Sequence, residues 1–115
     1  MEHIGVHAMD SIRAEQEIVQ FVKAVSEAYA PADIILFGSR ARAEHSEHSD
    51  YDFIVVSERF RGVRWHERRV ALQRLWHVSK DADFIPYTSE ELKRKSESSS
   101  VVRAALREGK RIRLD

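Results

Sequence analysis

Two short runs of consecutive apolar residues, Ile34–Phe37 and Phe53–Val56, place the strongest limits on the fold of this chain. Runs of this length that are rich in β-branched and aromatic residues are typical of buried strands. The first run stops at Gly38, and the polar segment 44–49 precedes the second. Both runs are far too short to span a bilayer. The sequence therefore predicts two buried strands joined by a polar connection.

The segments around these strands show helix and strand patterns in turn. An apolar stripe at steps of three and four residues predicts a helix from about Asp10 to Tyr29, and a second helix is expected over 64–78. Residues 82–87 are expected to form a strand, and a capping box at Thr88 opens a short helix. A last helix over 98–108 and a last strand over 111–114 complete the order. We expect sheet and helices to pack in layers as one domain over residues 1–115.

Composition excludes several classes of protein. The 19 basic and 19 acidic residues give a net charge of zero, which argues against a general nucleic-acid coat protein. The absence of cysteine excludes disulfides, thiolate zinc sites and thiol catalysis. The N-terminus lacks the charged start and apolar stretch of a signal peptide, so a cytoplasmic protein without a membrane span is expected.

Gly38 and Ser39, which end the first apolar run, form the first part of a candidate site. Glycine permits a sharp turn and a close approach of the backbone. The amide groups of such a turn, or of a helix that follows it, bind phosphate well. Arg40 and Arg42 add cationic donors nearby. The turn is therefore a candidate phosphate site.

Asp50 and Asp52 lie at the start of the second apolar strand. Residues two apart on a strand face the same side, with Cα atoms about 6.6 Å apart. Two carboxylates held so close cost free energy unless a cation neutralises them, and Mg²⁺ prefers such oxygen ligands. The pair beside a phosphate-binding turn favours two-metal phosphoryl or nucleotidyl transfer.

A third carboxylate is expected from a neighbouring strand. Asp83 opens the strand 82–87, and Asp81 lies two residues earlier. Because adjacent strands are about 4.8 Å apart, a carboxylate at either position could reach the same metals. Asp83 is preferred, because it directly precedes an apolar run as Asp52 does, and Asp81 is the alternative.

The order of apolar strand, Gly38-Ser39, a ten-residue spacer and Asp50-x-Asp52 resembles the minimal nucleotidyltransferase (MNT) domain of the DNA polymerase β-like nucleotidyltransferase superfamily. The third acid of that family falls on Asp83. The resemblance covers residues 32–91 closely, and the whole chain in length and order of elements. It implies an α/β (α+β) nucleotidyltransferase fold, a mixed β-sheet of about four strands with helices packed mainly on one face.

The same resemblance implies how a nucleotide would be bound. Gly38 and Ser39 would hold the triphosphate of ATP, which serves as the nucleotide donor. Arg40 or Arg42 would offset the negative charge that grows during transfer.

The resemblance implies catalytic and metal-binding roles for the three acids. Asp50 and Asp52 would bind two Mg²⁺ ions. Asp83 would ligate the catalytic metal and help to deprotonate an acceptor hydroxyl, which would attack the α-phosphate of ATP while pyrophosphate leaves.

Proteins of this size in the MNT group are similar to antitoxins that pair with a HEPN-family ribonuclease toxin. The resemblance therefore implies a partner toxin whose tyrosine accepts AMP. A first alternative, from a different class, is a catalytically silent module that neutralises a partner protein by contact alone.

A second alternative is an RNA-binding accessory domain, with nucleic acid as the partner. Its basis is a basic segment in an otherwise neutral chain, made of Arg59, Arg61, Arg64, Arg68, Arg69 and Arg74. Arg68 falls within the apolar arc of the expected helix 64–78, which also holds Trp65, Leu72 and Trp76. Arg68 either extends its charge out of the core or points at an anion. The oligomeric state stays open.

Overall fold

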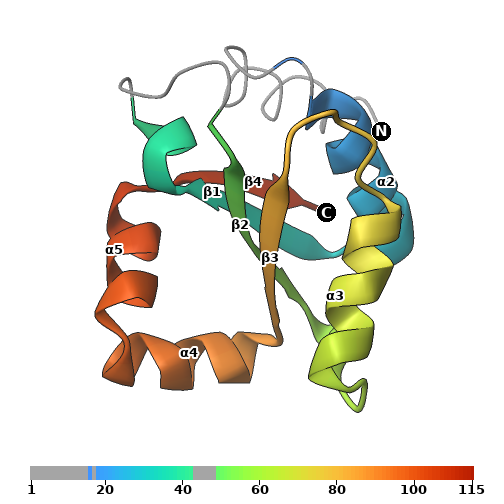
Figure 1. The fold of residues 1–115 in the computed structure, drawn as a ribbon. Coiled ribbons are helices and arrows are strands. Elements are labelled where there is room, and N and C mark those ends of the chain that lie inside the picture. Colours follow the sequence, from blue (N-terminus) through green and yellow to red (C-terminus); the bar gives the residue numbers. More distant parts are fainter. Residues whose placement is uncertain (1–15, 17, 43–48) are drawn as a thin grey trace.

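The structure is a computed structural model, and it describes residue 16 and residues 18–42 and 49–115. Within these residues, four strands form one mixed sheet in the order β3-β2-β1-β4 (Figure 1). The central strand β1 pairs antiparallel with both β2 and β4, and β2 pairs parallel with the edge strand β3. The strands are β1 Ala32–Phe37, β2 Tyr51–Ser57, β3 Ala82–Tyr87 and β4 Lys110–Leu114.

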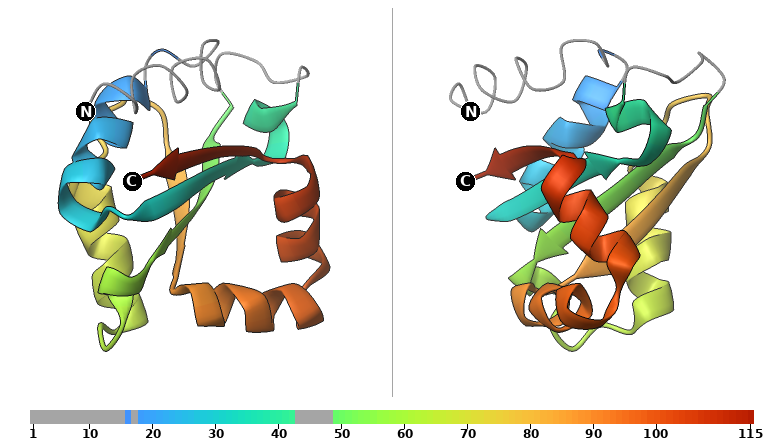
Figure 2. Two further views of the ribbon diagram at one scale, coloured as in Figure 1. Left: turned by 180° about the vertical axis from the view of Figure 1, so that it is seen from behind. Right: turned by 90° about the vertical axis from the view of Figure 1, so that its left-hand side faces the viewer.

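Helices cover both faces of the sheet, as the views in Figure 2 show. One face is covered by α2 and α3, the other by α4 and α5. The expected mixed sheet and fold class are confirmed, but the helices do not lie mainly on one face. The reason is that residues of both parities in β1 and β2 are apolar, so each face must be buried. The helices are α2 Val19–Tyr29, α3 Trp65–Arg74, α4 Ser89–Ser98 and α5 Ser100–Glu108.

Most sequence-based boundaries lie within a few residues of the observed ones. The strand 82–87 is found as expected, and the capping box at Thr88 is present in full. The helix expected from Asp10 is observed from Val19, and the N-cap proposed at Asp10 lies outside the described residues. The helix expected over 64–78 already ends at Arg74. No helix in the described ranges is long and apolar enough to cross a membrane.

An aromatic cluster fills the core between the sheet and helices α2 and α3. The rings of Phe21 and Phe53 lie 5.2 Å apart, and Trp76 packs edge-on against Phe21 at the same distance. Tyr51 stacks on Phe53 with a 5.7 Å centroid distance, as expected for a side chain turned away from the acids. Aromatic pairs contribute about 0.5–1.5 kcal/mol each beyond area burial, so this cluster fixes β2 firmly.

The side chain of Arg68 lies in the interior and binds an anion, which is the second of the two expectations for this residue. Its guanidinium donates to both carboxylate oxygens of Glu91 at 2.7 and 3.2 Å. It also donates to the backbone oxygens of Val63 and Pro86. Glu91 in turn accepts from the backbone N–H of Thr88. The start of α3, the end of β3 and the start of α4 are thereby joined.

Replacing Glu91 with Gln keeps an acceptor for the helix cap but removes the charge that compensates the buried Arg68. Loss of one partner of a buried ion pair is strongly destabilising, so Glu91→Gln should lower the free energy of unfolding by about 3 kcal/mol at pH 7. Urea denaturation measures this. The matched control Glu90→Gln changes an exposed neighbour and should cost less than about 0.5 kcal/mol. Equal losses in the two variants would contradict this account of the ion pair.

The ion pair of Arg68 and Glu91 also makes the free energy of unfolding depend on pH. Hydrogen bonds from Arg68 lower the pKa of Glu91 from 4.5 to about 2. The folded-state pKa is lower than the unfolded one, so the stabilisation is fully present above pH 4.5. It is lost as the pH falls from there through about 2. The stability difference between the wild type and Glu91→Gln should therefore shrink over that window.

Candidate active site

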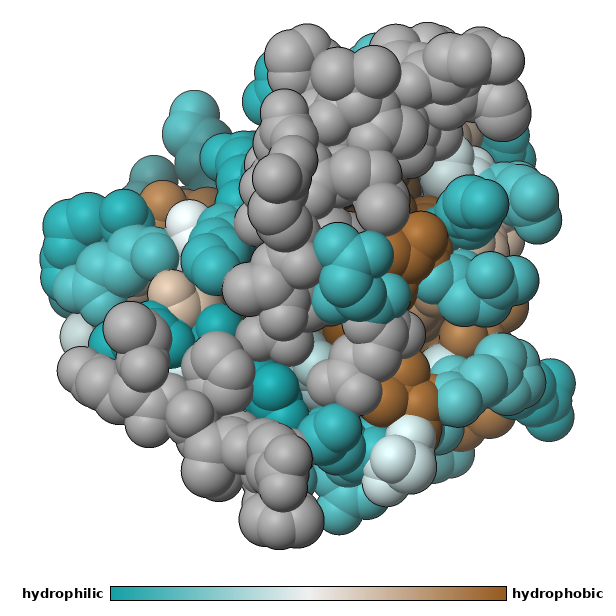
Figure 3. All heavy atoms as spheres, turned by 90° about the horizontal axis from the view of Figure 1, so that it is seen from above, coloured by the Kyte–Doolittle hydropathy of each residue, from teal (hydrophilic) through white to brown (hydrophobic). Residues whose placement is uncertain are grey.

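Three residues of adjacent strands form a row across one face of the sheet. Asp52 of β2 pairs with Phe37 of β1 on one side and with Asp83 of β3 on the other. Because Tyr51 and Phe53 are buried against α2 and α3, strand alternation turns Asp52 to the face covered by α4 and α5. The row lies where β1 ends and β2 and β3 begin, at the upper end of the sheet in Figure 1. Figure 3 shows the molecule from that side, with hydrophilic and apolar described residues next to one another.

Gly38 brings the backbone turn into direct contact with Asp52. Its φ of +75° lies in the left-handed region that favours glycine. A Cβ at this position would collide with the carboxylate oxygen Oδ2 of Asp52. Gly38 begins the short 3₁₀ helix η2, Gly38–Ala41, which also contains the half-buried Ser39. The candidate phosphate turn and the candidate metal ligand therefore share one site.

A backbone hydrogen bond connects the start of β2 with the residue that precedes β3. The backbone N–H of Tyr51 donates to the backbone oxygen of Asp81 at 2.9 Å. The parallel register then sets Asp83 directly beside Asp52. Asp81 thus joins the two strands through its backbone, and the structure places Asp83 rather than Asp81 next to the carboxylate of Asp52.

Arg40 is not positioned as the sequence suggested. Only 4% of this residue is exposed, and its guanidinium lies 4.5 Å from the ring centre of Tyr51, on the sheet face opposite the acids. Its Nε donates to the backbone oxygen of Ser49 at 3.1 Å. Arg40 therefore holds the residue that precedes Asp50, and its guanidinium lies on the sheet face away from the acids. From the sequence one can tell only that Arg40 is a cation near the turn. The direction of its side chain depends on the Tyr51 ring, which follows eleven residues later.

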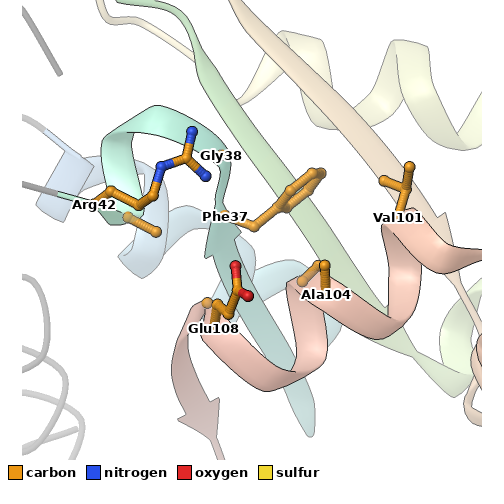
Figure 4. A pocket seen from close by; sticks show the side chains of 9 residues that line it. Phe37, Gly38, Arg42, Val101, Ala104 and Glu108 are labelled. Atoms are coloured by element: carbon orange, nitrogen blue, oxygen red, sulfur yellow. The ribbon is translucent and has the colours of Figure 1, made fainter. Parts of the chain in front are cut away.

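Arg42 is exposed and lines a pocket of about 270 Å³ beside the turn. Figure 4 shows the ring of Phe37 projecting between the turn and α5, with Arg42 and Glu108 bordering the same pocket. Of the two arginines expected to contribute charge, Arg42 is the one that stands next to Gly38 at the surface.

Electrostatic repulsion among the three acids Asp50, Asp52 and Asp83 contributes to a raised pKa of Asp52. Burial raises the pKa of its carboxyl above the usual 3.8, and the charges of Asp83 and then Asp50 raise it further. Within residues 49–115 and the other described segments, no Arg or Lys forms an ion pair with any of these three acids. Without a bound cation, the repulsion among these three carboxylates therefore lowers the stability of the folded protein.

The donor set fits a hard divalent cation. The three groups offer carboxylate oxygens, which Mg²⁺ prefers, and their mutual repulsion is what a cation would relieve. In the part of the chain that the structure describes, no group of three His, Asp or Glu side chains is arranged so that it could hold a metal ion by itself. Asp50, Asp52 and Asp83 would therefore need oxygens from water and from a phosphate group to complete the coordination of an ion.

Comparison with known proteins identifies the family of this chain. The sequence model of the nucleotidyltransferase domain family matches residues 18–111, so the chain belongs to that family. This membership assigns the chain to transferases that move a nucleotidyl group. No curated protein matches the chain in sequence.

The fold also has a structural counterpart. The chain is similar to a proposed nucleotidyltransferase from Sulfolobus solfataricus whose crystal structure is known, with a TM-score of 0.57 and 22% sequence identity. The similarity covers 76% of this chain and 78% of that chain. It concerns the arrangement of strands and helices.

A methyl group at Gly38 should disrupt the site. Gly38→Ala forces a β-carbon into the Asp52 carboxylate, in addition to a strain of about 1–2 kcal/mol from the left-handed backbone. Gly62→Ala is the matched control, because Gly62 has a φ of +79° but nothing within 4 Å of the added carbon. Gly38→Ala should lose at least as much stability in urea as Gly62→Ala, and only Gly38→Ala should lose nucleotidyl transfer. Equal activity in the two would contradict the contact.

The pKa of Asp52 reports which acid lies beside it. Asp83→Asn should lower this pKa by removing the nearest charge, although burial keeps it above 3.8. Asp81→Asn should leave it unchanged. Carboxyl ¹³C NMR titration without metal measures both. Because the folded-state pKa of Asp52 is raised, its ionisation costs stability as the pH rises, so Asp83→Asn should be more stable than the wild type at pH 7.

Proposed function

We propose that this chain is a Mg²⁺-dependent nucleotidyltransferase that moves AMP from ATP to a hydroxyl group. The observation that carries the proposal is the position of Asp52, which lies against Gly38 on one side and pairs with Asp83 on the other. In this proposal, the residues assigned to phosphate binding, to metal binding and to proton transfer lie at one end of the sheet. Nucleotidyl transfer requires these three groups within reach of one phosphorus atom.

The residues have separate tasks in the proposed reaction. Gly38 and Ser39 hold the triphosphate, and the exposed Arg42 stands beside them to offset negative charge. Asp50 and Asp52 are the proposed ligands of two Mg²⁺ ions, which supply electrostatic stabilisation of the attacking and leaving oxygens.

In this proposal Asp83 receives the proton of the acceptor hydroxyl, and it would also help to hold the catalytic metal. The hydroxyl oxygen forms a bond to the α-phosphorus of ATP, and the bond from that phosphorus to the bridging oxygen of pyrophosphate breaks. Pyrophosphate leaves with the electron pair on the side of the Gly38-Ser39 turn. The acceptor therefore approaches from the side of Asp83 and the edge strand β3.

The proposed acceptor is a tyrosine of a HEPN-family toxin, which would make the chain a cytoplasmic antitoxin of the MNT type. The support is the spacing of Gly38, Ser39, Asp50 and Asp52, which resembles that of MNT proteins. Membership in the nucleotidyltransferase domain family agrees with this chemistry.

A second candidate function is neutralisation of a partner by contact alone. It requires no acidic cluster. The raised pKa of Asp52 and the absence of ion pairs to the three acids among the described residues favour chemistry instead. Uncompensated carboxylates lower the stability of a scaffold that does not use them.

Removal of the two proposed metal ligands should abolish transfer and leave the fold intact. We expect Asp50→Ala with Asp52→Ala to show no incorporation from radiolabelled ATP and Mg²⁺ into the protein encoded by the neighbouring reading frame. Urea denaturation should show no loss of stability, because the repulsion is gone. Asp81→Ala is the control and should retain transfer. Undiminished transfer by the double variant would rule out this site.

Two outcomes separate the candidate functions. If the double variant still neutralises the partner while its transfer activity is lost, contact is sufficient for neutralisation. If neutralisation and label incorporation are lost together, neutralisation depends on the transferred AMP.

A further inference from the structure

A second pocket lies at the other end of β3, away from the acids. It has a volume of about 320 Å³ and lies between the first turn of α3 and the outer side of α4. Its size falls within the range of small-ligand pockets, which begins at about 300 Å³. It is lined by Trp65, Tyr87, Glu91, Arg94, Lys95 and Ser98.

Trp65 forms an aromatic wall of this pocket. It is 44% exposed, although the sequence placed it in the buried arc of the helix. The buried position one turn later is taken by Arg68, so the indole lies over the edge of the sheet instead. Its ring packs on that of Tyr87 at a centroid distance of 5.5 Å, which holds the indole in place while it stays open to solvent.

The hydroxyl of Tyr87 is a hydrogen-bond donor that has no partner in the described part of the chain. Only 7% of Tyr87 is exposed, and its hydroxyl makes no hydrogen bond to any described residue. Burial, followed by the charge of Glu91, raises the pKa of this hydroxyl above 10, so it carries its proton at neutral pH. Because Tyr87 lines the pocket, its hydroxyl can donate a hydrogen bond to a ligand bound there.

The charges around the pocket favour an anion. Arg94 and Lys95 line one side of it. The only carboxylate in the lining, Glu91, is held by Arg68 at 2.7 Å and is thereby compensated. Arg94 has a 3.5 Å contact with Glu90, but both side chains are about two-thirds exposed. Exposed pairs of this kind are weak, so Arg94 can turn to a ligand at little cost.

We propose that this pocket binds a nucleotide, with its base stacked on Trp65 and its phosphate bound by Arg94, Lys95 and the Tyr87 hydroxyl. An aromatic platform next to cations is the usual means of binding a base together with its phosphate. Tyr87 lies four residues along β3 from Asp83, about 13 Å at the rise of a strand. The pocket is therefore separate from the candidate active site and does not depend on its function.

Nuclear magnetic resonance provides a local test. The full chain is titrated in EDTA with AMP, adenosine and tetra-adenylate RNA, and the indole N–H signal of Trp65 is followed, assigned by its loss in Trp65→Phe. We expect AMP to shift this signal with saturation below 1 mM, and adenosine to bind at least about tenfold more weakly. Stronger binding of the RNA, weakened by salt, identifies the end of an RNA chain as the source of the nucleotide. Equal or weaker binding of the RNA identifies a free nucleotide.

Matched variants test the proposed contacts. Trp65→Ala, which lacks the Trp65 indole signal and is followed through the backbone amide signals of Arg94 and Lys95, should weaken AMP binding at least about fivefold, as expected for loss of a stacking platform. Lys95→Gln should weaken it several-fold, whereas Lys93→Gln, which changes an exposed lysine of the same helix, should not. The proposal is overturned if AMP causes no shift up to 1 mM. It is also overturned if adenosine binds as well as AMP, or if Lys93→Gln and Lys95→Gln have equal effects.

Discussion

The close approach of the Asp52 carboxylate to Gly38, which leaves no room for a β-carbon at residue 38, determines how the rest of the site is arranged. It exists because β1 and β2 pair antiparallel, so that the end of one strand lies beside the start of the other. The aromatic cluster that contains Tyr51 and Phe53 fixes β2. The hydrogen bond from the backbone N–H of Tyr51 to the backbone oxygen of Asp81 connects β2 with the start of β3. The packing energy of the core thus holds together carboxylates that would otherwise repel one another.

The fold was largely predictable because its signals are local. Continuous apolar runs predicted β1 and β2, and the Thr88 and Ser99 caps explain where α4 and α5 begin. The distribution of the helices over both faces of the sheet was not predicted. It depends on which residues of each strand meet which helix, as with Ile35 and Ile54 against α4 and α5, and this is a property of the assembled sheet.

The site shows the same division between local and distant effects. The positions of Gly38, Asp52 and Asp83 follow from turn chemistry and strand alternation, both of which act over a few residues. The inward direction of Arg40 depends on the ring of Tyr51 and the backbone oxygen of Ser49, which follow Arg40 in the sequence only after most of the polar connection. The exchange of Trp65 and Arg68 between surface and interior depends on Glu91, which is more than twenty residues away.

The ion pair of Arg68 and Glu91 connects the two layers of the molecule. The two apolar cores lie on opposite faces and have only the sheet in common, and Arg68, which belongs to the α3 layer, reaches past the edge of β3 to the helix of the other layer. Helices α3 and α4 cannot move apart without breaking this pair. The protein should therefore unfold as a single cooperative unit, with hydrogen exchange in α3 and α4 governed by the same global opening.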